Sequence, residues 1–436
     1  MKNKGITLIS LVVTIVVLII LAGVAINLTL GENGVFRKAK QAKEQYGNAV
    51  ESEEQQLNEL YAQLGVQGEL PENTPETDVG TIVKLKDSWA TETMRYVSTT
   101  DGKDITNVQK VSTVYAVSVG DGNTVPVPTG FYYVGGNLTT GVVISDKEVD
   151  KYNGTDRTAY SYSSQLQGNQ FVWIPCNESE YKKTSWGQGN VTNRSNSCWD
   201  TTTSGMELAQ IRKYGGFYVA RYEAGLASTI TPVTTDTIYN SGVYSVAGVP
   251  TSKAGQIPWN FISWTQSQIN AQSMYNTNSV SSALITGTQW DVMINKIASA
   301  ESKSLTSSGA WGNYYDVATT YTGRYATYNT STTKLNAFSA EESTNATKAA
   351  NNYVLLTTGA SEKVKAYNVY DVAGNLWEWT EETSYYGGNS ATQYRVLRGG
   401  SCNNASATYP ACYRGGNNTV SLTNYTVGFR AVLYMK

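Results

Sequence analysis

The sequence contains no histidine among its 436 residues. Ser-His-Asp and Cys-His catalysis and imidazole-ligated zinc, copper or iron all require this residue. Most hydrolase and metalloenzyme classes are therefore excluded. Charge is also scarce, because charged residues make up 16% of the chain and 33 Lys and Arg against 35 Asp and Glu leave a net charge of −2. Such a chain has no field that attracts phosphate backbones, so we expect no nucleic-acid partner.

Phenylalanine is rare as well, with 7 residues, whereas tyrosine reaches 31 and tryptophan 10. Tyrosine joins a flat apolar ring to a polar tip and has few rotamers to lose, which suits a recognition surface as well as a strand-rich fold. The hydrophobic fraction of 40% argues against a disordered chain, because disorder combines few apolar residues with a high net charge.

Charged residues are absent from the stretch 6–30 near the N-terminus. As a helix this run is longer than the roughly 30 Å hydrocarbon core of a bilayer, so we expect a transmembrane segment. A secretory signal peptide cleaved near residues 23–25 is the alternative. Lys, Glu, Gln and Ala dominate the next stretch, which predicts an extended helix over 6–64 and then a proline-containing linker over 65–80.

Two lysines and a glycine, in Lys-Asn-Lys-Gly at 2–5, precede the apolar run. This segment resembles the leader of type IV prepilins and pseudopilins. The resemblance implies that residues 1–5 are a leader peptide cut after Gly5, that Ile6 becomes the methylated N-terminus, and that the C-terminal domain lies outside the cell on a single-pass anchor. Family members usually carry Glu at the fifth mature position, where this chain has Ser10. That carboxylate helps to register pilin subunits, so the resemblance favours a minor or tip subunit of a pilus, or a simple anchored protein, over a major pilin.

Beyond the linker, short apolar runs alternate with Gly, Asn and Ser, and residues 81–124 predict a β-rich stalk or edge extension. The strands expected include 113–119, 131–134, 142–144 and 171–174. Helical periodicity is confined to 265–274, behind the cap candidate Ser263, and to 288–297. The pattern predicts an α+β domain with few helices over 125–436.

Eight sequence blocks are spread through this domain. They are FVWIP at 171–175, GFYVARYE at 216–223, IPWNFISW at 257–264, LITGTQWD at 284–291, WGN at 311–313, NVYDVAGNLWEWT at 368–380, RVLRGGS at 395–401 and GFR at 428–430. In this order they resemble the formylglycine-generating enzyme (sulfatase-modifying factor) family. The resemblance implies a variant of the C-type lectin fold.

The oxidases of that family hold copper with two cysteines shortly after the Gly-Gly-Ser block. The corresponding positions fall near Asn404 and Tyr409, and Cys402 and Cys412 lie at a shifted spacing. Comparison with the family therefore implies the scaffold without copper and without the oxidase chemistry. A formylglycine-generating-type oxidase or a related sulfatase-modifying enzyme remains the alternative.

The chain has four cysteines. Outside the cytoplasm an even number permits disulfides, here Cys402 with Cys412 and Cys176 with Cys198. Buried free thiols are the alternative, and in both cases the cysteines are expected to be structural.

In the family, the block that corresponds to 371–378 wraps a structural calcium ion. Carried over by position, the implied ligands are the Asp371 side chain, the carbonyls of Val372, Gly374 and Leu376, and Glu378. Oxygen-only donors suit Ca²⁺ better than Zn²⁺. The alternative has no ion, and in it Asp371 caps a turn while Glu378 pairs with an arginine such as Arg398 or Arg430.

The run 402–426 is polar and has few aliphatic residues to bury. On a rigid scaffold such a loop presents adaptable hydrogen bonds and flat rings. It resembles the variable region of proteins diversified by retroelements, which place a ligand-binding surface on the same fold; an ordinary polar surface turn is the alternative. The residues expected to contact a ligand are Asn403, Asn404, Ser406, Thr408, Tyr409, Tyr413, Arg414, Asn417, Asn418 and Thr419. Trp377 and Trp379 are interpreted mainly as core residues.

Together these features predict a non-catalytic, adhesin-like protein that is displayed on the cell membrane. Its partner is expected to be an extracellular protein or a glycan, with other pilins as further partners. Two other functions stay open, namely the formylglycine-type oxidase and a structural minor pilin.

Overall fold

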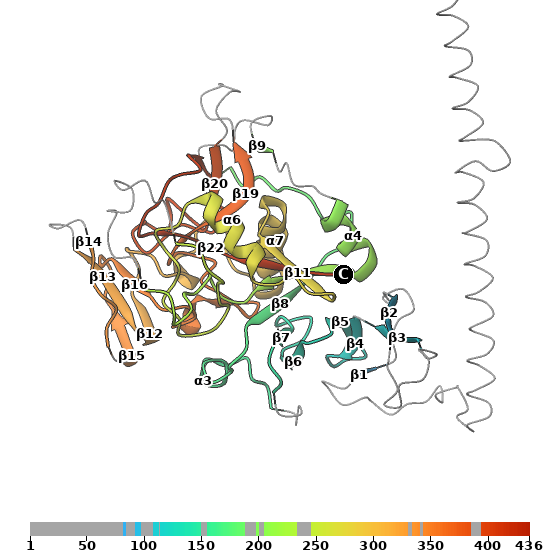
Figure 1. The fold of residues 1–436 in the computed structure, drawn as a ribbon. Helices are drawn as coiled ribbons and strands as arrows, with labels where there is room; N and C mark the ends of the chain where they lie inside the picture. Colours follow the sequence, from blue (N-terminus) through green and yellow to red (C-terminus); the bar gives the residue numbers. More distant parts are fainter. Residues whose placement is uncertain are drawn as a thin grey trace, which may run out of the picture. The chain divides into compact units, whose positions relative to one another are not determined.

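The computed structural model describes residues 114–149, 155–187, 205–232, 246–329, 334–340, 343–384 and 394–436, with the strand residues 82–83, 92–96, 108–112 and 198–199 (Figure 1). The chain divides into the units Met1–Pro75 and Glu76–Lys436, and all described residues belong to the second. The predicted leader, transmembrane segment and linker lie outside the described residues. Within the described part of the chain, no helix has the length and apolar character needed to cross a membrane.

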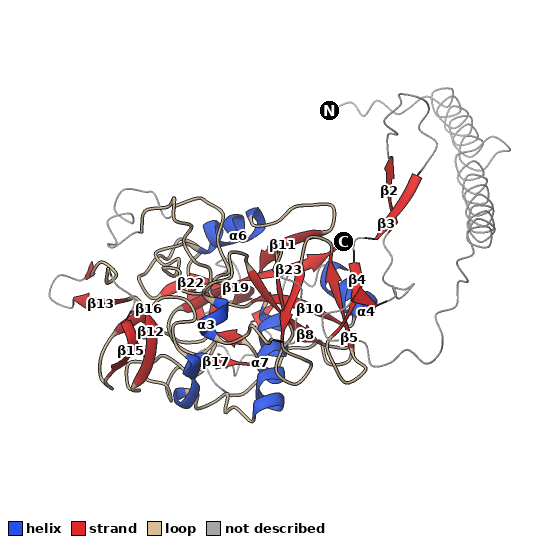
Figure 2. Cartoon of the chain, turned by 90° about the horizontal axis from the view of Figure 1, so that it is seen from below, coloured by secondary structure: helices blue, strands red, loops and turns tan. Residues whose placement is uncertain are grey.

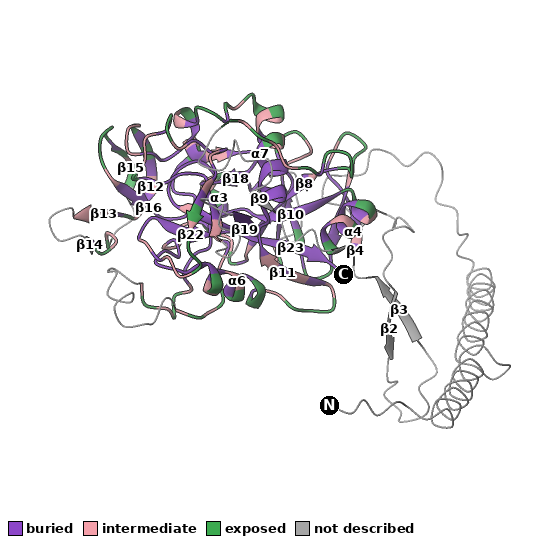
Figure 3. Ribbon diagram, turned by 90° about the horizontal axis from the view of Figure 1, so that it is seen from above, coloured by how far each residue is buried: buried purple, intermediate pink, exposed green. Residues whose placement is uncertain are grey.

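A six-stranded antiparallel sheet forms the centre of the domain, with the strand order β11, β23, β10, β8, β7, β6. In that order the strands are Val280–Leu284, Ala431–Met435, Gly216–Ala220, Gln170–Pro175, Val143–Ser145 and Tyr132–Gly135. The central strands β10 and β23 are buried along their whole length, which is typical of strands covered on both faces. Figure 3 shows these strands in the colour of buried residues.

The two faces of this sheet belong to two separate hydrophobic clusters. In β8, Phe171 and Trp173 lie in one cluster, whereas Val172 and Ile174 lie in the other. Successive strand residues point to opposite faces, so a continuous apolar run fills two cores at once. The sheet therefore lies between the two hydrophobic clusters and contributes side chains to both.

Two helices cover the sheet, one on each side (Figure 2). Helix α6 (Trp264–Ser273) contributes Trp264 and Ala271 to the first cluster, and α7 (Gly287–Glu301) contributes Trp290 and Ile294 to the second. Both helices were predicted to within a few residues. The side chain of Ser263 accepts a hydrogen bond from the Gln266 amide at 3.3 Å, which confirms the predicted cap.

Helix α7 begins with a reciprocal cap that was not predicted from the sequence. The Thr286 hydroxyl accepts from the Gln289 amide, and the Gln289 side chain accepts from the Thr286 amide, both at 3.1 Å. Two further helices were also not predicted, α3 (Tyr160–Ser163) and α4 (Gly205–Tyr214).

A second sheet supports the polar loop, with the order β21 (Gly415–Asn418), β20 (Tyr394–Arg398), β19 (Trp377–Ser384) and β22 (Val427–Phe429). Strand β9 (Cys198–Trp199) also pairs with β19. Strands β19 and β22 run parallel, and the other pairs are antiparallel. The paired strands β20 and β21 enclose residues 399–414, the first part of the predicted loop 402–426, so the two ends of this segment are fixed side by side.

The remaining elements are short. They are β1 (Ile82–Val83), β2 (Glu92–Tyr96), β3 (Val108–Ser112), β4 (Val114–Ser118), β5 (Thr124–Pro128), β12 (Thr319–Gly323), β13 (Tyr325–Asn329), β14 (Lys334–Leu335), β15 (Ser343–Lys348), β16 (Val354–Leu356), β17 (Lys365–Ala366), β18 (Val369–Tyr370) and the 3-10 turns η2 (Gly309–Trp311) and η3 (Glu362–Val364). Strands β1 to β4 lie within residues 81–124, for which strands were predicted, whereas β5 begins at Thr124 and extends past the predicted boundary. The role of residues 81–124 as a stalk or an edge extension stays a prediction.

Strand β15 ends in a buried lysine. The ammonium group of Lys348 donates to the carbonyls of Tyr314 at 2.6 Å, Val317 at 2.7 Å and Asn352 at 3.4 Å. Burial lowers the pKa of Lys348 to about 8. The ammonium is thus held by neutral acceptors in place of a carboxylate.

We expect this lysine to make the free energy of unfolding rise between pH 8 and pH 10. Its pKa is lower in the folded chain than in the unfolded one, so in this window the unfolded chain binds the extra proton. As the pH rises and protons become scarce, the unfolded chain therefore loses stability relative to the folded state. The slope cannot exceed the roughly 1.4 kcal/mol per pH unit that one proton supplies. Urea unfolding at several pH values should show the free energy of unfolding of the wild type rising relative to that of Lys348→Met from pH 8 to pH 10; equal slopes in both proteins would contradict the assignment.

Candidate ligand-binding pocket

The backbone of residues 401–414 is held by side chains outside this segment. The indole N–H of Trp290 donates to the Ala411 carbonyl at 3.2 Å. The Ser406 amide and hydroxyl donate to the two carboxylate oxygens of Asp316 at 2.9 and 3.1 Å. The segment is thus fixed at two points between its ends, so its exposed side chains project from a constrained backbone.

An ion cluster lies beneath this segment. Its members are Lys183, Asp291, Glu382, Arg398 and Arg414. Arg398 reaches Asp291 at 2.8 Å and Glu382 at 3.4 Å, while Arg414 pairs with Asp291 and reaches Glu382 at 3.2 Å. Because Arg398 ends β20 and Arg414 precedes β21, these pairs hold both ends of the loop on helix α7 and strand β19.

The two carboxylates of the ion cluster differ in their electrostatics. Burial raises the pKa of Asp291 despite its two arginine partners. Burial also opposes the ionisation of Glu382, but Arg414, Lys183 and Arg398 together hold the pKa of that carboxyl below its usual range. Both carboxylates are fully buried. Their charges are therefore stabilised by the other members of the ion cluster and not by solvent.

A small pocket of about 330 Å³, the loop pocket, opens above this support. Its walls come from the start of β19, the end of β20, the segment 401–414 and β21. The lining residues are Trp377, Leu397, Asn404, Tyr409, Tyr413, Gly415, Asn417 and Asn418. None of them is charged.

Three aromatic rings of the loop pocket pack edge to face. The ring centroids lie 5.6 Å apart for Trp377 and Tyr409, 5.7 Å for Trp377 and Tyr413, and 4.9 Å for the two tyrosines. The interplanar angles are 79°, 64° and 65°. This geometry is favoured by the ring quadrupoles, so each ring restrains the other two.

The amides of the loop pocket offer a mixture of donors and acceptors. The Asn404 side-chain oxygen accepts from the Ser401 amide and hydroxyl at 3.0 and 2.8 Å, which leaves its NH₂ group for a ligand. The Asn418 NH₂ donates to the Gly415 carbonyl at 2.6 Å, which leaves its oxygen. Burial and the neighbouring Tyr409 raise the pKa of Tyr413, so this phenol stays neutral at physiological pH.

Five of the ten predicted contact residues line the loop pocket, namely Asn404, Tyr409, Tyr413, Asn417 and Asn418. Asn403, Thr408 and Thr419 are exposed but lie outside it. Two predictions need correction. Arg414 is buried, because its guanidinium belongs to the ion cluster. Ser406 is also buried, and its hydroxyl donates to the Asp316 carboxylate. Neither side chain is therefore available as a surface contact.

Three residues of the loop pocket were not predicted as contacts. Leu397 and Gly415 belong to β20 and β21, and Trp377 opens β19. Trp377 was interpreted as core, but it is half-buried and packs on the two tyrosines, whereas Trp379 is fully buried as predicted. Alternation along β19 does not distinguish the two, because residues two apart share a face and differ here only in what covers them.

The described cysteines Cys176, Cys402 and Cys412 are buried free thiols, which corrects the disulfide prediction for Cys402 with Cys412. Cys402 packs in one hydrophobic cluster and Cys412 in another. Burial raises the pKa of Cys402 to about 12 and that of Cys412 to about 11. The side chain of Cys198 lies outside the described residues.

The two side chains of the predicted calcium site, Asp371 and Glu378, are engaged by other groups of the protein in this arrangement. Both Glu378 oxygens accept from Arg430, at 2.6 and 3.0 Å. Asp371 accepts from the Gly359 amide at 2.7 Å, and burial raises its pKa to about 7. These are the contacts of the alternative interpretation without an ion. Among the described residues no group of three or more Cys, Asp or Glu side chains is placed to hold a metal, and a calcium ion at 371–378 stays a prediction.

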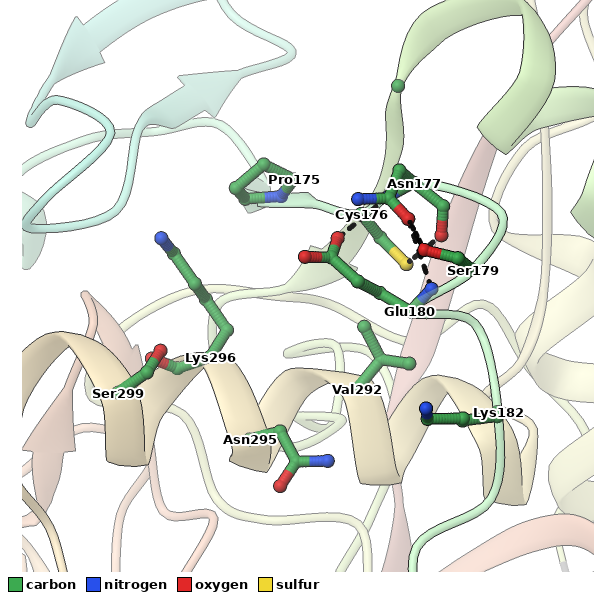
Figure 4. Close-up of a pocket in the computed structure, with 11 residues that line it drawn as sticks. Pro175, Cys176, Asn177, Ser179, Glu180, Lys182, Val292, Asn295, Lys296 and Ser299 are labelled. Carbon is green, nitrogen blue, oxygen red and sulfur yellow. Dashed lines mark hydrogen bonds between the residues drawn. The ribbon is translucent and has the colours of Figure 1, made fainter.

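A larger cavity of about 710 Å³ lies between the segment after β8 and helix α7 (Figure 4). Cys176 and Val292 line it, with Lys296 projecting from the helix. The Cys176 thiol donates to the Asn177 carbonyl at 3.2 Å, and burial raises its pKa to about 12. The Glu180 carboxylate accepts from the Asn177 amide at 2.9 Å. The Glu180 carboxylate and the Cys176 thiol of this cavity thus both bond to the neighbouring Asn177 backbone. None of the predicted contact residues lines the cavity.

Fold and pocket together define a β-rich α+β domain that carries a small neutral pocket on a restrained loop. Residues 247–435 match the family described as "Sulfatase-modifying factor enzyme 1-like domain". This match supports the resemblance drawn from the sequence blocks for that part of the chain. None of the curated proteins matches.

Two solved structures resemble the chain loosely. "Crystal Structure of CarF" is 12% identical with a TM-score of 0.29, covering 51% of this chain and 87% of that one. "Major Tropism Determinant P3c Variant" is 13% identical with a TM-score of 0.28, covering 82% and 86%. TM-scores of this size do not establish a common fold.

Proposed function

We propose that this protein binds an extracellular ligand through the loop pocket and does so without catalysis. The loop pocket carries the proposal, because it combines three rings that restrain one another with amides on a backbone fixed from outside. Rigid aromatic groups with adaptable amides are the residue types that recognition surfaces use, since little conformational entropy is lost on binding. The lectin-like fold implied by the sequence blocks is the proposed scaffold.

The absence of catalysis in this proposal is supported by the thiols. An oxidase of the formylglycine type needs two cysteines that meet at copper, and Cys402 and Cys412 belong to different clusters, with pKa values that burial raises. A buried thiol with a raised pKa is a poor nucleophile and a poor metal ligand. Neither cysteine lines the loop pocket.

Display on the cell membrane is the second part of the proposal. It is supported by the sequence alone, through the uncharged run 6–30 and the prepilin-like segment around Gly5 and Ile6. The protein would then present its domain outside the cell, alone or as a minor pilus subunit.

Replacing Tyr409, Tyr413 and Asn417 together by alanine is expected to lower binding of the full-length protein to target cells at least tenfold. The reason is that tyrosine side chains in such surfaces carry a large share of the binding energy. Binding is measured by flow cytometry with labelled protein over a range of concentrations. The matched control is the double variant Asn403→Ala, Thr408→Ala, which changes exposed residues of the same loop outside the pocket.

The control variant should bind as the wild type does, and circular dichroism should be the same for all three proteins. Equal binding by the triple variant would refute the proposal and favour a purely structural subunit. Turnover of a cysteine peptide that is lost in Cys402→Ser or Cys412→Ser would instead show the oxidase.

A further inference from the structure

We infer that the loop pocket takes a neutral saccharide residue, an inference that rests on the proposed function. The first step is charge. None of the eight lining residues is an acid or a base, and Arg414, the chain neighbour of two of them, directs its guanidinium to Asp291 and Glu382. An ionic ligand group would lose its hydration here without gaining an opposite charge. The pocket therefore disfavours phosphates, carboxylates and ammonium groups.

The second step is the pattern of hydrogen-bonding groups. Asn404 offers a donor, Asn418 offers an acceptor, and the Asn417 side chain, which has no hydrogen-bond partner among the described residues, offers both. The phenols of Tyr409 and Tyr413 also donate and accept. A hydroxyl group is the ligand group that does both, so several neighbouring hydroxyls satisfy this mixture.

The third step separates a sugar from an apolar side chain. An aliphatic or aromatic group in the loop pocket would bury amides without hydrogen-bond partners, and each polar group left unsatisfied opposes binding. A pyranose ring presents hydroxyls on its rim and C–H groups on its faces, and the C–H faces suit the rings of Trp377, Tyr409 and Tyr413. The volume of about 330 Å³ lies at the lower end of ligand pockets, so it suits one or two sugar units.

This mode of binding differs from that of lectins in which a bound metal ion holds the sugar hydroxyls. All the groups assigned above are side-chain amides, phenols and an indole, and none is a carboxylate. We therefore expect binding to be independent of calcium.

The test uses full-length protein and methyl glycosides of glucose, galactose, mannose, N-acetylglucosamine and N-acetylgalactosamine, with glucuronic acid and sialic acid glycosides as charged comparators. Saturation-transfer NMR and calorimetry should show binding of at least one neutral glycoside and no stronger binding of a charged one. Asn417→Ala should weaken it at least tenfold and Tyr413→Phe, which removes only the hydroxyl, about threefold, while Asn403→Ala and added EGTA should have no effect. Tyr413→Phe keeps the ring, and Asn417→Ala keeps the neighbouring amide of Asn418. Weaker binding by these variants therefore reports a lost pocket contact and not a loss of folding.

The outcomes distinguish this inference from the proposed function. Loop-dependent cell binding that survives enzymatic removal of surface glycans, with no neutral glycoside bound, overturns the saccharide inference and shows a protein ligand. Preference for the charged glycosides, or a loss of binding with EGTA while circular dichroism shows the fold unchanged, also overturns it. Absence of both cell and glycoside binding overturns the proposed function itself.

Discussion

Replacing Asp291 by alanine is expected to destabilise the folded protein by about 3–5 kcal/mol. The change leaves the guanidinium groups of Arg398 and Arg414 buried against the single carboxylate of Glu382, and an uncompensated buried charge costs more than the pair itself contributed. The Thr184 amide also loses its acceptor, the Asp291 carboxylate at 2.9 Å. Urea unfolding followed by tryptophan fluorescence measures the effect.

The matched control is the same kind of pair at the surface. Arg212 and Glu178 form an exposed salt bridge, and Glu178→Ala should leave the unfolding midpoint unchanged, because water replaces the lost partner. A drop of less than 1 kcal/mol for Asp291→Ala would show that the ion cluster is hydrated and does not hold the loop.

Replacing Trp290 by alanine should cost a similar amount, about 3–5 kcal/mol. The side chain is fully buried in the second hydrophobic cluster and carries the N–H that holds the Ala411 carbonyl. Its loss opens a cavity below the loop and leaves a backbone acceptor unsatisfied. Thermal unfolding and the affinity for the ligand are both measured, because the cavity lies beneath the segment that forms the pocket wall.

Trp290→Phe separates the two contributions. Phenylalanine keeps most of the packing and removes the N–H, so we expect a loss of about 1–3 kcal/mol from the orphaned carbonyl and part of the ring volume. Equal losses in the alanine and phenylalanine variants would mean that the hydrogen bond, not the packing, supports the loop. No loss in either would contradict the assigned role of Trp290.

Helices and strands with clear periodicity could be predicted from the sequence. Helix α7 follows from its apolar spacing, α6 from its cap at Ser263, and β8 from a continuous apolar run. Helix α4 was missed although Leu208, Ile211 and Tyr214 stand at helical spacing in its residues 205–214. The helix is short, and polar or charged residues separate its apolar ones.

The candidate site could be predicted in part. A polar, aromatic stretch after Gly-Gly-Ser indicates a presented loop, and five of its residues do meet in one pocket. Local sequence does not reveal that Arg414 lies under the loop, because its partners Asp291 and Glu382 are more than thirty residues away in the chain. The contribution of Trp377 is hidden for the same reason, since it depends on β19 and the loop coming together.

The contacts that fix the segment 401–414 from outside reach mostly main-chain atoms, as the Trp290 bond to the Ala411 carbonyl and the Arg398 bond to the Cys412 carbonyl illustrate. Every amino acid supplies a carbonyl. The pocket-lining positions Tyr409 and Tyr413, both within this segment, can therefore change identity without altering the course of the chain. Such a scaffold lets a lineage acquire new specificities by point substitution while folding stays the same.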